Sequence, residues 1–442
     1  MALLLAAASR EAAAGKPKAR RCEVARAGFA PGLHSVHVHV GSGQREFRLF
    51  VPASYQPTLP IPFWILAPGS YESPGNFLDM TGMVEFAKKR NFAFAALEGE
   101  DRLLNVALGA RGDPDRPDDV RYTGAVLRKV TQSLCVDMDR IRCTGFSRGA
   151  RFCSRIASEL SSFIAGIAPV AGVRFPSPNN ATRAMPIIAI HGTQDRINPY
   201  WGRGDSPFWH ATVADSVKHW VKFNGCKQHS WERMSPHVMA SRYTQCSDNA
   251  DVVLIIVEDG GHTWPGSTYR YNKHKFGNNT LEISANEVMY HFFVEHPRVP
   301  TCHTAVEGEA CYAAVQQAMH TGPKDLTDRA GRLTSDSSFE DFQAMLHEEF
   351  RADCPRPCPP GESPRADRTA APTSTEAHTP RPTTTETTTS TTTATSTVTT
   401  TATTTETTTE TTTRATTTTK STTTETTTET TTETNTETTT ET

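Results

Sequence analysis

Short apolar segments recur along roughly the first 300 residues of the chain and predict a series of strands. Residues 35–40 alternate polar and apolar side chains, which predicts a half-buried strand. Residues 45–51 are expected to pair back with it as a hairpin across the turn at 41–43. Continuous apolar segments that predict fully buried strands follow at residues 62–66, 92–97, 141–144, 163–170, 186–190 and 252–257.

Segments with a helical spacing of apolar residues separate these strands. They lie at residues 83–90, 118–133, 150–160, 213–223 and 284–293. Buried strands that alternate with helices predict a mostly parallel sheet covered on both faces, with the antiparallel hairpin at its start. The expected fold class is therefore α/β, in the arrangement of an α/β-hydrolase, over residues 25–300.

The sequence changes in character after residue 300. Residues 311–319 and 338–350 predict two amphipathic helices, and four cysteines bracket them. We expect a small helical module at residues 301–360 held by two disulfides, because so short a segment rarely has a sufficient core of its own. The alternative is a C-terminal extension that packs against the main domain.

Threonine and glutamate dominate residues 361–442, and no Phe, Trp or Tyr occurs from Arg368 onward. Such a segment cannot bury enough apolar surface to offset the entropy of ordering its backbone, so it is expected to be disordered. Its Thr-rich composition is typical of an O-glycosylated stalk. A plain unmodified tail is the alternative.

The start of the chain and its net charge limit the cellular location and the partners that can be expected. Residues 1–24 open on a short apolar segment that predicts a weak signal peptide, with a disordered Ala-rich leader as the alternative. No apolar run reaches the roughly 18 residues needed to span a bilayer. With a net charge of −3 and no basic stripe, the chain offers no reason to expect nucleic acid as a partner.

The sequence contains 10 cysteines, a high count. Those in or near expected core elements are candidates for free buried thiols: Cys22, Cys135, Cys143 and Cys153. Those in turn-rich regions favour disulfides: Cys226, Cys246, Cys302, Cys311, Cys354 and Cys358. Together with glycosylation sequons at Asn180 and Asn278, the disulfides indicate an extracellular protein.

The pentapeptide at residues 145–149, Gly-Phe-Ser-Arg-Gly, joins an expected strand to an expected helix. This is the sequence of a nucleophile elbow, in which the glycines allow a tight turn that exposes the serine hydroxyl at the end of the sheet. Ser147 is thus the candidate nucleophile. The alternative is a serine at an ordinary strand–helix turn.

An aspartate and a histidine follow in the chain order that this fold requires. Asp195 comes just after a predicted buried strand and could orient a catalytic histidine, although an Asx turn is a common role for such a residue. His262 lies in the Gly-rich loop 259–266 and would accept the serine proton. A lone loop histidine is usually only solvated. Asp259 is a rival carboxylate, but it is too close in sequence to orient the ring easily.

Three segments carry a resemblance to a known family: residues 145–149, 191–200 and 260–266. The last, with its Gly-Gly-His-x-Trp-Pro-Gly pattern, is the most specific. Over roughly residues 34–296 the chain resembles the secreted esterase family that includes feruloyl esterases and polyhydroxybutyrate depolymerases. The resemblance implies an α/β-hydrolase fold, a Ser147–Asp195–His262 triad and a disulfide between Cys226 and Cys246.

The chain departs from this family at the loop after the strand at 62–66. The family usually has His-Gly there, where this sequence has Ala-Pro-Gly-Ser. Proline has no N–H, so one oxyanion donor must come from Gly69, Ser70 or Tyr71, and the other from the N–H of Arg148. Losing one such donor typically costs about 3 kcal/mol in transition-state stabilisation, so the change could weaken activity. The Arg148 side chain could favour an anionic substrate or point to solvent.

These observations predict a secreted, monomeric serine carboxylic-ester hydrolase that needs no metal or organic cofactor. Its expected partners are ester-bearing polymers: feruloyl or acetyl esters of polysaccharide first, and polyhydroxyalkanoate second. Trp264 could stack on an aromatic acyl group or a sugar, or simply pack within its loop. Two alternatives remain, a catalytically impaired binding protein with the altered oxyanion loop and a serine peptidase of the same fold.

Overall fold

A computed structural model describes residues 22, 28–41, 43–106, 113, 115–204, 209–298, 302–321, 333 and 337–359, and the backbone of 399–418 and 421–440. The chain divides into two compact units, residues 1–371 and 372–442. Apart from Cys22, the expected leader at 1–24 lies outside the described residues.

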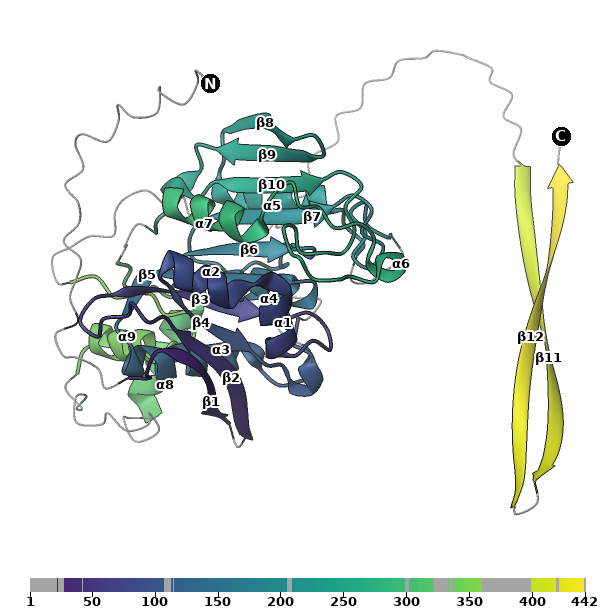
Figure 1. Cartoon of the computed structure of the whole chain (residues 1–442), viewed down its shortest axis with the longest axis horizontal. Coiled ribbons are helices and arrows are strands. Elements are labelled where there is room, and N and C mark those ends of the chain that lie inside the picture. The colour runs from purple at the N-terminus through teal and green to yellow at the C-terminus, as the bar shows by residue number, and fades with distance from the viewer. Residues whose placement is uncertain are drawn as a thin grey trace, which may run out of the picture. The chain divides into compact units, whose positions relative to one another are not determined.

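A ten-stranded sheet forms the centre of the first unit (Figure 1), in the order β1-β2-β4-β3-β5-β6-β7-β10-β9-β8. The strands are β1 Gly32–Val40, β2 Gly43–Val51, β3 Ile61–Ala67, β4 Ala93–Leu97, β5 Val136–Phe146, β6 Gly166–Val170, β7 Ile187–Gly192, β8 Gln228–Ser235, β9 Val238–Thr244 and β10 Val252–Val257. The six central strands, from β4 to β10 in that order, run parallel, whereas β1, β2, β9 and β8 pair antiparallel. The predicted α/β-hydrolase architecture is confirmed.

Helices cover both faces of this sheet, and each face has its own hydrophobic core. Helices α3 Asp119–Ser133, α4 Arg148–Glu159 and α5 Val213–Asn224 pack on one face, and α1 Pro74–Thr81, α2 Met83–Arg90 and α7 Ala285–Glu295 on the other. Short helical turns complete the fold: η1 Glu100–Arg102, η2 Ser247–Asn249 and α6 Lys273–Phe276. Successive side chains of a strand point to opposite faces. Thus Ile65 enters one core and Trp64 the other, and both faces of β3 are buried.

Strand β8 and helix α1 are two of the elements that the sequence does not predict, and each has a physical reason. Strand β8 is an exposed edge strand, and its polar residues carry no apolar pattern. It pairs with β9, which extends the sheet beyond β10. Helix α1 has only eight residues, too few for a clear period, and is marked by the capping hydroxyl of Ser73 and by Pro74 in its first turn.

All ten cysteines are paired. The bonds are Cys22–Cys135, Cys143–Cys153, Cys226–Cys246, Cys302–Cys358 and Cys311–Cys354. The pairing of Cys226 with Cys246 agrees with the resemblance. The interpretation of Cys22, Cys135, Cys143 and Cys153 as free thiols is wrong, because the fold brings each of them next to another. Residues 143 and 153, for example, lie on a strand and on the helix that packs against it.

The segment after residue 301 forms two helices, α8 Ala310–Thr321 and α9 Phe339–Glu348, around a small hydrophobic cluster of its own. It is nevertheless docked on the main domain. Phe350 enters the larger core, and the buried Asp353 carboxylate accepts hydrogen bonds from the Ser161 hydroxyl at 2.6 Å and the Ser162 N–H at 2.7 Å. Burial raises the pKa of Asp353 to about 6. The segment thus combines its own disulfides with a packed interface.

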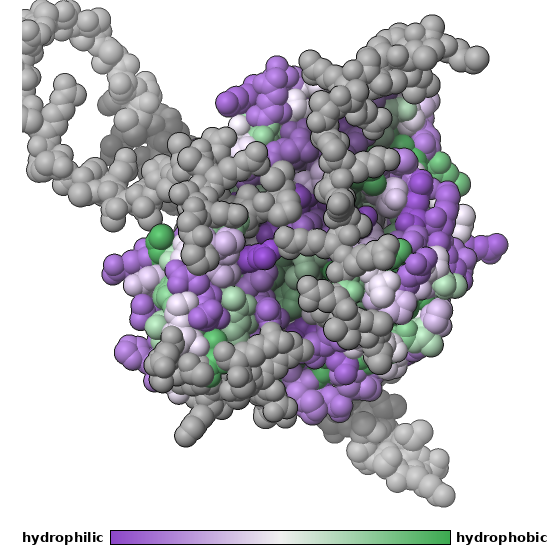
Figure 2. Space-filling view, turned by 90° about the vertical axis from the view of Figure 1, so that its left-hand side faces the viewer, coloured by the Kyte–Doolittle hydropathy of each residue, from purple (hydrophilic) through white to green (hydrophobic). Residues whose placement is uncertain are grey.

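Figure 2 views the left-hand side of Figure 1, and its described residues are mainly hydrophilic, with smaller hydrophobic areas among them. No helix in the described part of the chain is long and apolar enough to cross a membrane.

In the second unit, β11 Thr399–Thr418 and β12 Ser421–Thr440 pair antiparallel. Threonine is β-branched and favours extended backbone. A hairpin of two strands alone is marginally stable in water, because it buries little apolar surface. Disorder of the tail at 361–442 in solution therefore stays a prediction, and residues 360–398 lie outside the described residues.

Candidate active site

Ser147 lies in a tight turn between β5 and α4. Its backbone has φ 56° and ψ −113°, a conformation that a non-glycine residue adopts only when its surroundings enforce it. A Cβ atom at Gly149 would lie 1.8 Å from the carbonyl oxygen of Ala67, and one at Gly145 would lie 2.6 Å from Gly149. Both positions therefore require glycine. The local structure is the strand–elbow–helix that the sequence predicts.

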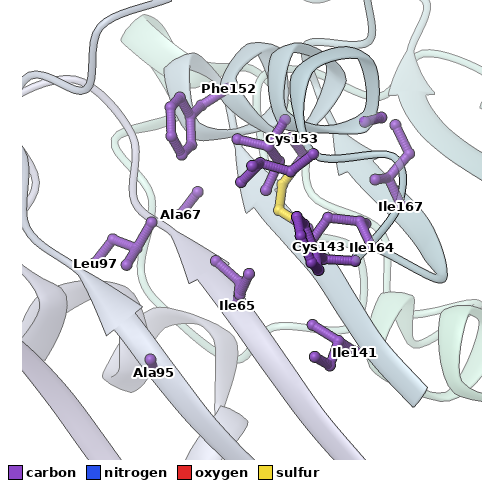
Figure 3. Packing of buried hydrophobic residues seen from close by; sticks show 14 of the residues in the cluster. Ile65, Ala67, Ala95, Leu97, Ile141, Cys143, Phe152, Cys153, Ile164 and Ile167 are labelled. Carbon is purple, nitrogen blue, oxygen red and sulfur yellow. A yellow bond between two sulfur atoms is a disulfide. The ribbon is translucent and has the colours of Figure 1, made fainter. Parts of the chain in front are cut away.

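A disulfide fastens the same turn from inside the core. Cys143 on β5 and Cys153 on α4 are fully buried and bonded to each other (Figure 3). The elbow at residues 145–149 therefore lies within the loop that this bond closes. The bond links the two elements whose close approach forms the elbow. It therefore restrains the part of the fold that positions Ser147.

Asp195 and His262 form a buried hydrogen-bonded pair. Nδ1 of His262 lies 2.6 Å from Oδ2 of Asp195, and both side chains are almost completely buried. The other oxygen, Oδ1, accepts the backbone N–H groups of Ile197 at 2.9 Å and Asn198 at 2.8 Å. One carboxylate thus makes both the Asx turn and the contact with the histidine, which the sequence presented as alternatives.

Hydrogen bonds keep Asp195 ionised in this buried position. Burial by itself would raise the pKa of its carboxyl group, but hydrogen bonds with His191 and His262 hold that pKa well below its usual range. A charged carboxylate can stabilise an imidazolium at His262. The rival carboxylate, Asp259, is exposed, and its backbone N–H donates to the Thr193 hydroxyl.

Ser147 lies next to this pair. The Asn198 side-chain amide reaches the Ser147 hydroxyl at 3.4 Å, while the Asn198 backbone N–H binds Asp195. The ring of Phe146, the residue before the serine, lies 4.7 Å from the ring of His262. Within the described ranges no hydrogen bond joins Ser147 to His262. In substrate-free sites such bonds are often long and tighten only in the complex.

Two polar residues of the site were not singled out by the sequence. The side chain of His191 is fully buried, and its Nε2 lies 2.8 Å from the carbonyl oxygen of Asn198 and 3.3 Å from Oδ2 of Asp195. Asn198 contacts both the Ser147 hydroxyl and the Asp195 carboxylate. Its Nδ2 also donates to the carbonyl of Ala171, just after β6, at 2.6 Å. A polar residue at the end of an apolar strand was the available signal for His191.

The oxyanion loop offers one N–H from the three expected residues. The Gly69 N–H donates to the Glu72 carboxyl group at 2.9 Å, and the Tyr71 N–H donates to the Arg102 carbonyl at 2.9 Å. The Ser70 N–H has no acceptor among the described residues. The Arg148 N–H opens α4, where the first N–H groups have no partner within the helix. Ser70 and Arg148 are the donors that remain for an oxyanion.

Two expectations about side chains need revision. Trp264 is 1% exposed, its Nε1–H donates to the Asn286 side chain at 3.0 Å, and its ring packs edge-on against Phe77. The expectation that Trp264 stacks on a substrate is therefore wrong, because the Trp264 side chain packs in the core, the alternative that the sequence left open. The Arg148 guanidinium does not simply point to solvent, because its Nε–H donates to the Leu104 carbonyl, and partial burial lowers its pKa.

Similar proteins are named as esterases. No protein-family model matches the chain. Over 287 residues the chain is 28% identical to “Putative esterase NocK” of Nocardia uniformis subsp. tsuyamanensis. The aligned region covers 58% of this chain and 81% of that protein. The chain is 28% identical over 155 residues to feruloyl esterase B of Piromyces equi, which is 33% of this chain and 29% of that protein. It is 23% identical over 218 residues to feruloyl esterase C of Emericella nidulans, which is 49% of this chain and 76% of that protein.

The chain can also be superimposed on solved structures of esterases. Acetyl xylan esterase from Aspergillus awamori aligns with a TM-score of 0.42 at 12% identity, over 59% of this chain and 98% of that one.

Among the sequence relatives, the region that aligns with feruloyl esterase B spans less than a third of that protein's length.

Replacing Gly149 with alanine should destabilise the elbow, because the new methyl group would overlap the Ala67 carbonyl. We expect a loss of roughly 1–3 kcal/mol or more in the free energy of unfolding, measured by urea denaturation. The matched control is Gly75→Ala, where the nearest atom to the new Cβ is 3.9 Å away. Equal stability of the two variants would contradict the close approach.

Replacing Asp195 with asparagine should lower kcat about 10⁴-fold on any ester that the wild type hydrolyses, because the amide no longer holds His262 in the required tautomer. Asp259→Asn is the control and should stay within about twofold of the wild type, since Asp259 is exposed. Steady-state kinetics distinguish the two carboxylates. A larger loss in Asp259→Asn would assign the role to the rival.

Proposed function

We propose that this protein is a serine carboxylic-ester hydrolase that acts through an acyl-enzyme. The observation that carries the proposal is the buried Asp195–His262 hydrogen bond beside a serine held in an elbow conformation. A neutral serine hydroxyl is a weak nucleophile and needs an adjacent base. This site provides a base, an anion that stabilises the protonated base, and a turn that places the hydroxyl at the end of the sheet.

The proposed reaction has two halves. Ser147 attacks the ester carbonyl while Nε2 of His262 takes the hydroxyl proton, and Asp195 stabilises the imidazolium that forms. The N–H groups of Ser70 and Arg148 bind the oxyanion. His262 then gives the proton to the departing alcohol, which leaves an acyl group on the serine. In the second half, water attacks this acyl group by the same steps, and the acid is released.

Two exposed aromatic side chains support a planar substrate. Tyr71 is 70% exposed beside Ser70 in the oxyanion loop, and Trp201 is 71% exposed in the segment that follows Asp195. Aromatic rings bind the faces of other aromatic rings and of sugars. Together with the names of the similar proteins, this favours feruloyl or acetyl esters of polysaccharide, and polyhydroxyalkanoate is the second substrate to test.

The oxyanion geometry weighs against a catalytically impaired binding protein. Pro68 removes one N–H from the loop, but Ser70 keeps one without an acceptor in the described part of the chain. A donor is thus available despite the departure from the family pattern. A serine peptidase would use the same triad, so only substrate tests separate it from an esterase.

Several features support secretion as part of the proposal. Five disulfides persist best in an oxidising compartment. The sequon residues Asn180 and Asn278 are both exposed, as glycosylation requires. The proposed enzyme is a monomer that acts outside the cell on ester-bearing polymers.

The direct test of the mechanism is labelling with a fluorophosphonate probe. The wild type and a Ser54→Ala control, which removes an exposed serine, should be labelled, and Ser147→Ala should not. Hydrolysis of methyl ferulate, acetylated xylan and polyhydroxybutyrate films should fall at least a thousandfold in Ser147→Ala. A folded wild type that stays unlabelled would favour the binding protein, and cleavage of peptides but not esters would favour the peptidase.

Replacing Trp201 with alanine should raise KM for methyl ferulate about tenfold with a smaller effect on an acetyl ester, because stacking acts on the aromatic acyl group. Trp231→Ala is the matched control, since Trp231 is also exposed, at 58%, but lies on the edge strand β8. Equal changes in both variants, measured by steady-state kinetics, would remove Trp201 from substrate binding.

A further inference from the structure

Glu72 closes the turn that carries the oxyanion loop. Its Oε2 accepts the Gly69 N–H at 2.9 Å, and its own backbone N–H donates to the Gly69 carbonyl at 3.3 Å. The central residues of this turn are Ser70 and Tyr71, and Tyr71 has a positive φ of 62°. A residue other than glycine at such a φ is held there by its surroundings. Glu72 supplies two of the hydrogen bonds that hold this turn.

These bonds determine which N–H the loop can offer. Glu72 takes up the Gly69 N–H, and the Arg102 carbonyl takes up that of Tyr71 at 2.9 Å. The Ser70 N–H between them has no acceptor among the residues that the structure describes, so it can donate to a ligand. Fixing a donor before the reaction matters, because an oxyanion hole works by pre-oriented dipoles.

The Glu72 side chain lies beside the proposed oxyanion donor, because its Oε2 accepts the N–H of Gly69, the residue before Ser70. A Cβ at Gly69 would be 3.2 Å from Oε2 of Glu72 and 3.4 Å from the ring of Phe146. That ring in turn lies 4.7 Å from His262. A charge on Glu72 would therefore act on an oxyanion in the site, and low polarity strengthens such interactions.

The surroundings of Glu72 disfavour its charged form. Partial burial raises the pKa of Glu72 to about 7, and the hydrogen bond from Gly69 opposes this only in part. The facing ionisable group on the loop after His262 is Tyr271, whose pKa is raised to about 12. The Arg148 guanidinium on α4 interacts with the neighbouring Tyr71. No arginine or lysine of the described residues lowers the pKa of Glu72.

We propose that Glu72 is the positioning residue of the oxyanion loop and that its neutral carboxyl group is the form that supports turnover. This proposal rests on the proposed hydrolase function. The carbonyl oxygen of the neutral acid accepts the Gly69 N–H and holds the turn. The ionised form holds it too, but places a negative charge beside the oxyanion. That charge opposes the transition state and not the neutral substrate, so it lowers kcat and leaves KM unchanged.

The test uses Glu72→Gln, whose amide oxygen keeps the acceptor without a charge, and Glu72→Ala, which removes it. The control is Glu85→Gln, an exposed carboxylate on α2. Rates with a soluble p-nitrophenyl ester are measured from pH 5 to 9. Because the unfavourable form accumulates as pH rises through about 7, the wild-type kcat should fall about tenfold between pH 7 and 9. Glu85→Gln should show the same fall.

At pH 9 the kcat of Glu72→Gln should exceed that of the wild type by about tenfold. Glu72→Ala should lose at least tenfold in kcat at every pH, with KM within about twofold. The proposal would be overturned if Glu72→Gln and Glu72→Ala both kept the wild-type pH profile and kcat. It would also be overturned if the variants changed only in KM. Glu72→Gln keeps the test valid if Glu72→Ala does not fold. Fluorophosphonate labelling separates the two failures, because an unlabelled wild type overturns the hydrolase function itself, whereas normal labelling of all variants leaves that function intact.

Discussion

The close approach of α4 to the end of β3 is the constraint on which the site depends. The Ala67 carbonyl occupies the place where residue 149 would carry a Cβ, so the helix can start where it does only with glycine there. Because the helix starts directly after Ser147, this serine adopts its unusual backbone conformation. The first N–H groups of the helix then point toward the space beside the Ser147 hydroxyl. The Cys143–Cys153 bond keeps the strand and the helix together.

The same carboxyl edge of the parallel sheet gathers the other parts of the site. Asp195 follows β7 and His262 follows β10, two strands that pair in parallel register. The two oxygens of Asp195 divide their roles, one for its own loop and one for the histidine. Asp195 thus both builds its own loop and orients the ring of His262. Asn198 extends these contacts to the serine.

Most of this could be predicted from sequence, because the chemistry leaves local marks. The elbow requires glycines at fixed offsets, and the parallel strands are continuous apolar segments. Prediction failed where a residue's role is set by distant neighbours. Trp264 lies two residues after His262 in sequence, yet its side chain contacts Phe77 and Asn286 in the core. The free-thiol interpretation of Cys143 failed because spacing alone does not show that a strand and the next helix place two sulfurs together.

The oxyanion loop shows the same limit. The sequence made Gly69, Ser70 and Tyr71 equivalent candidate donors. Hydrogen bonds to Glu72, within the turn, and to the Arg102 carbonyl, outside it, distinguish them. Nothing in the residue types indicates that Glu72 and the Arg102 carbonyl occupy two of the three N–H groups. The polar edge strand β8 was missed for a related reason, since its pairing with β9 and not its own pattern makes it a strand.

The most direct measurement is a crystal structure of the protein after reaction with a fluorophosphonate. We expect phosphorus bonded to Oγ of Ser147, the phosphoryl oxygen within hydrogen-bond distance of the N–H groups of Ser70 and Arg148, and Nε2 of His262 turned toward Oγ. An adduct on another residue, or a His262 ring directed away from the adduct, would contradict this expectation.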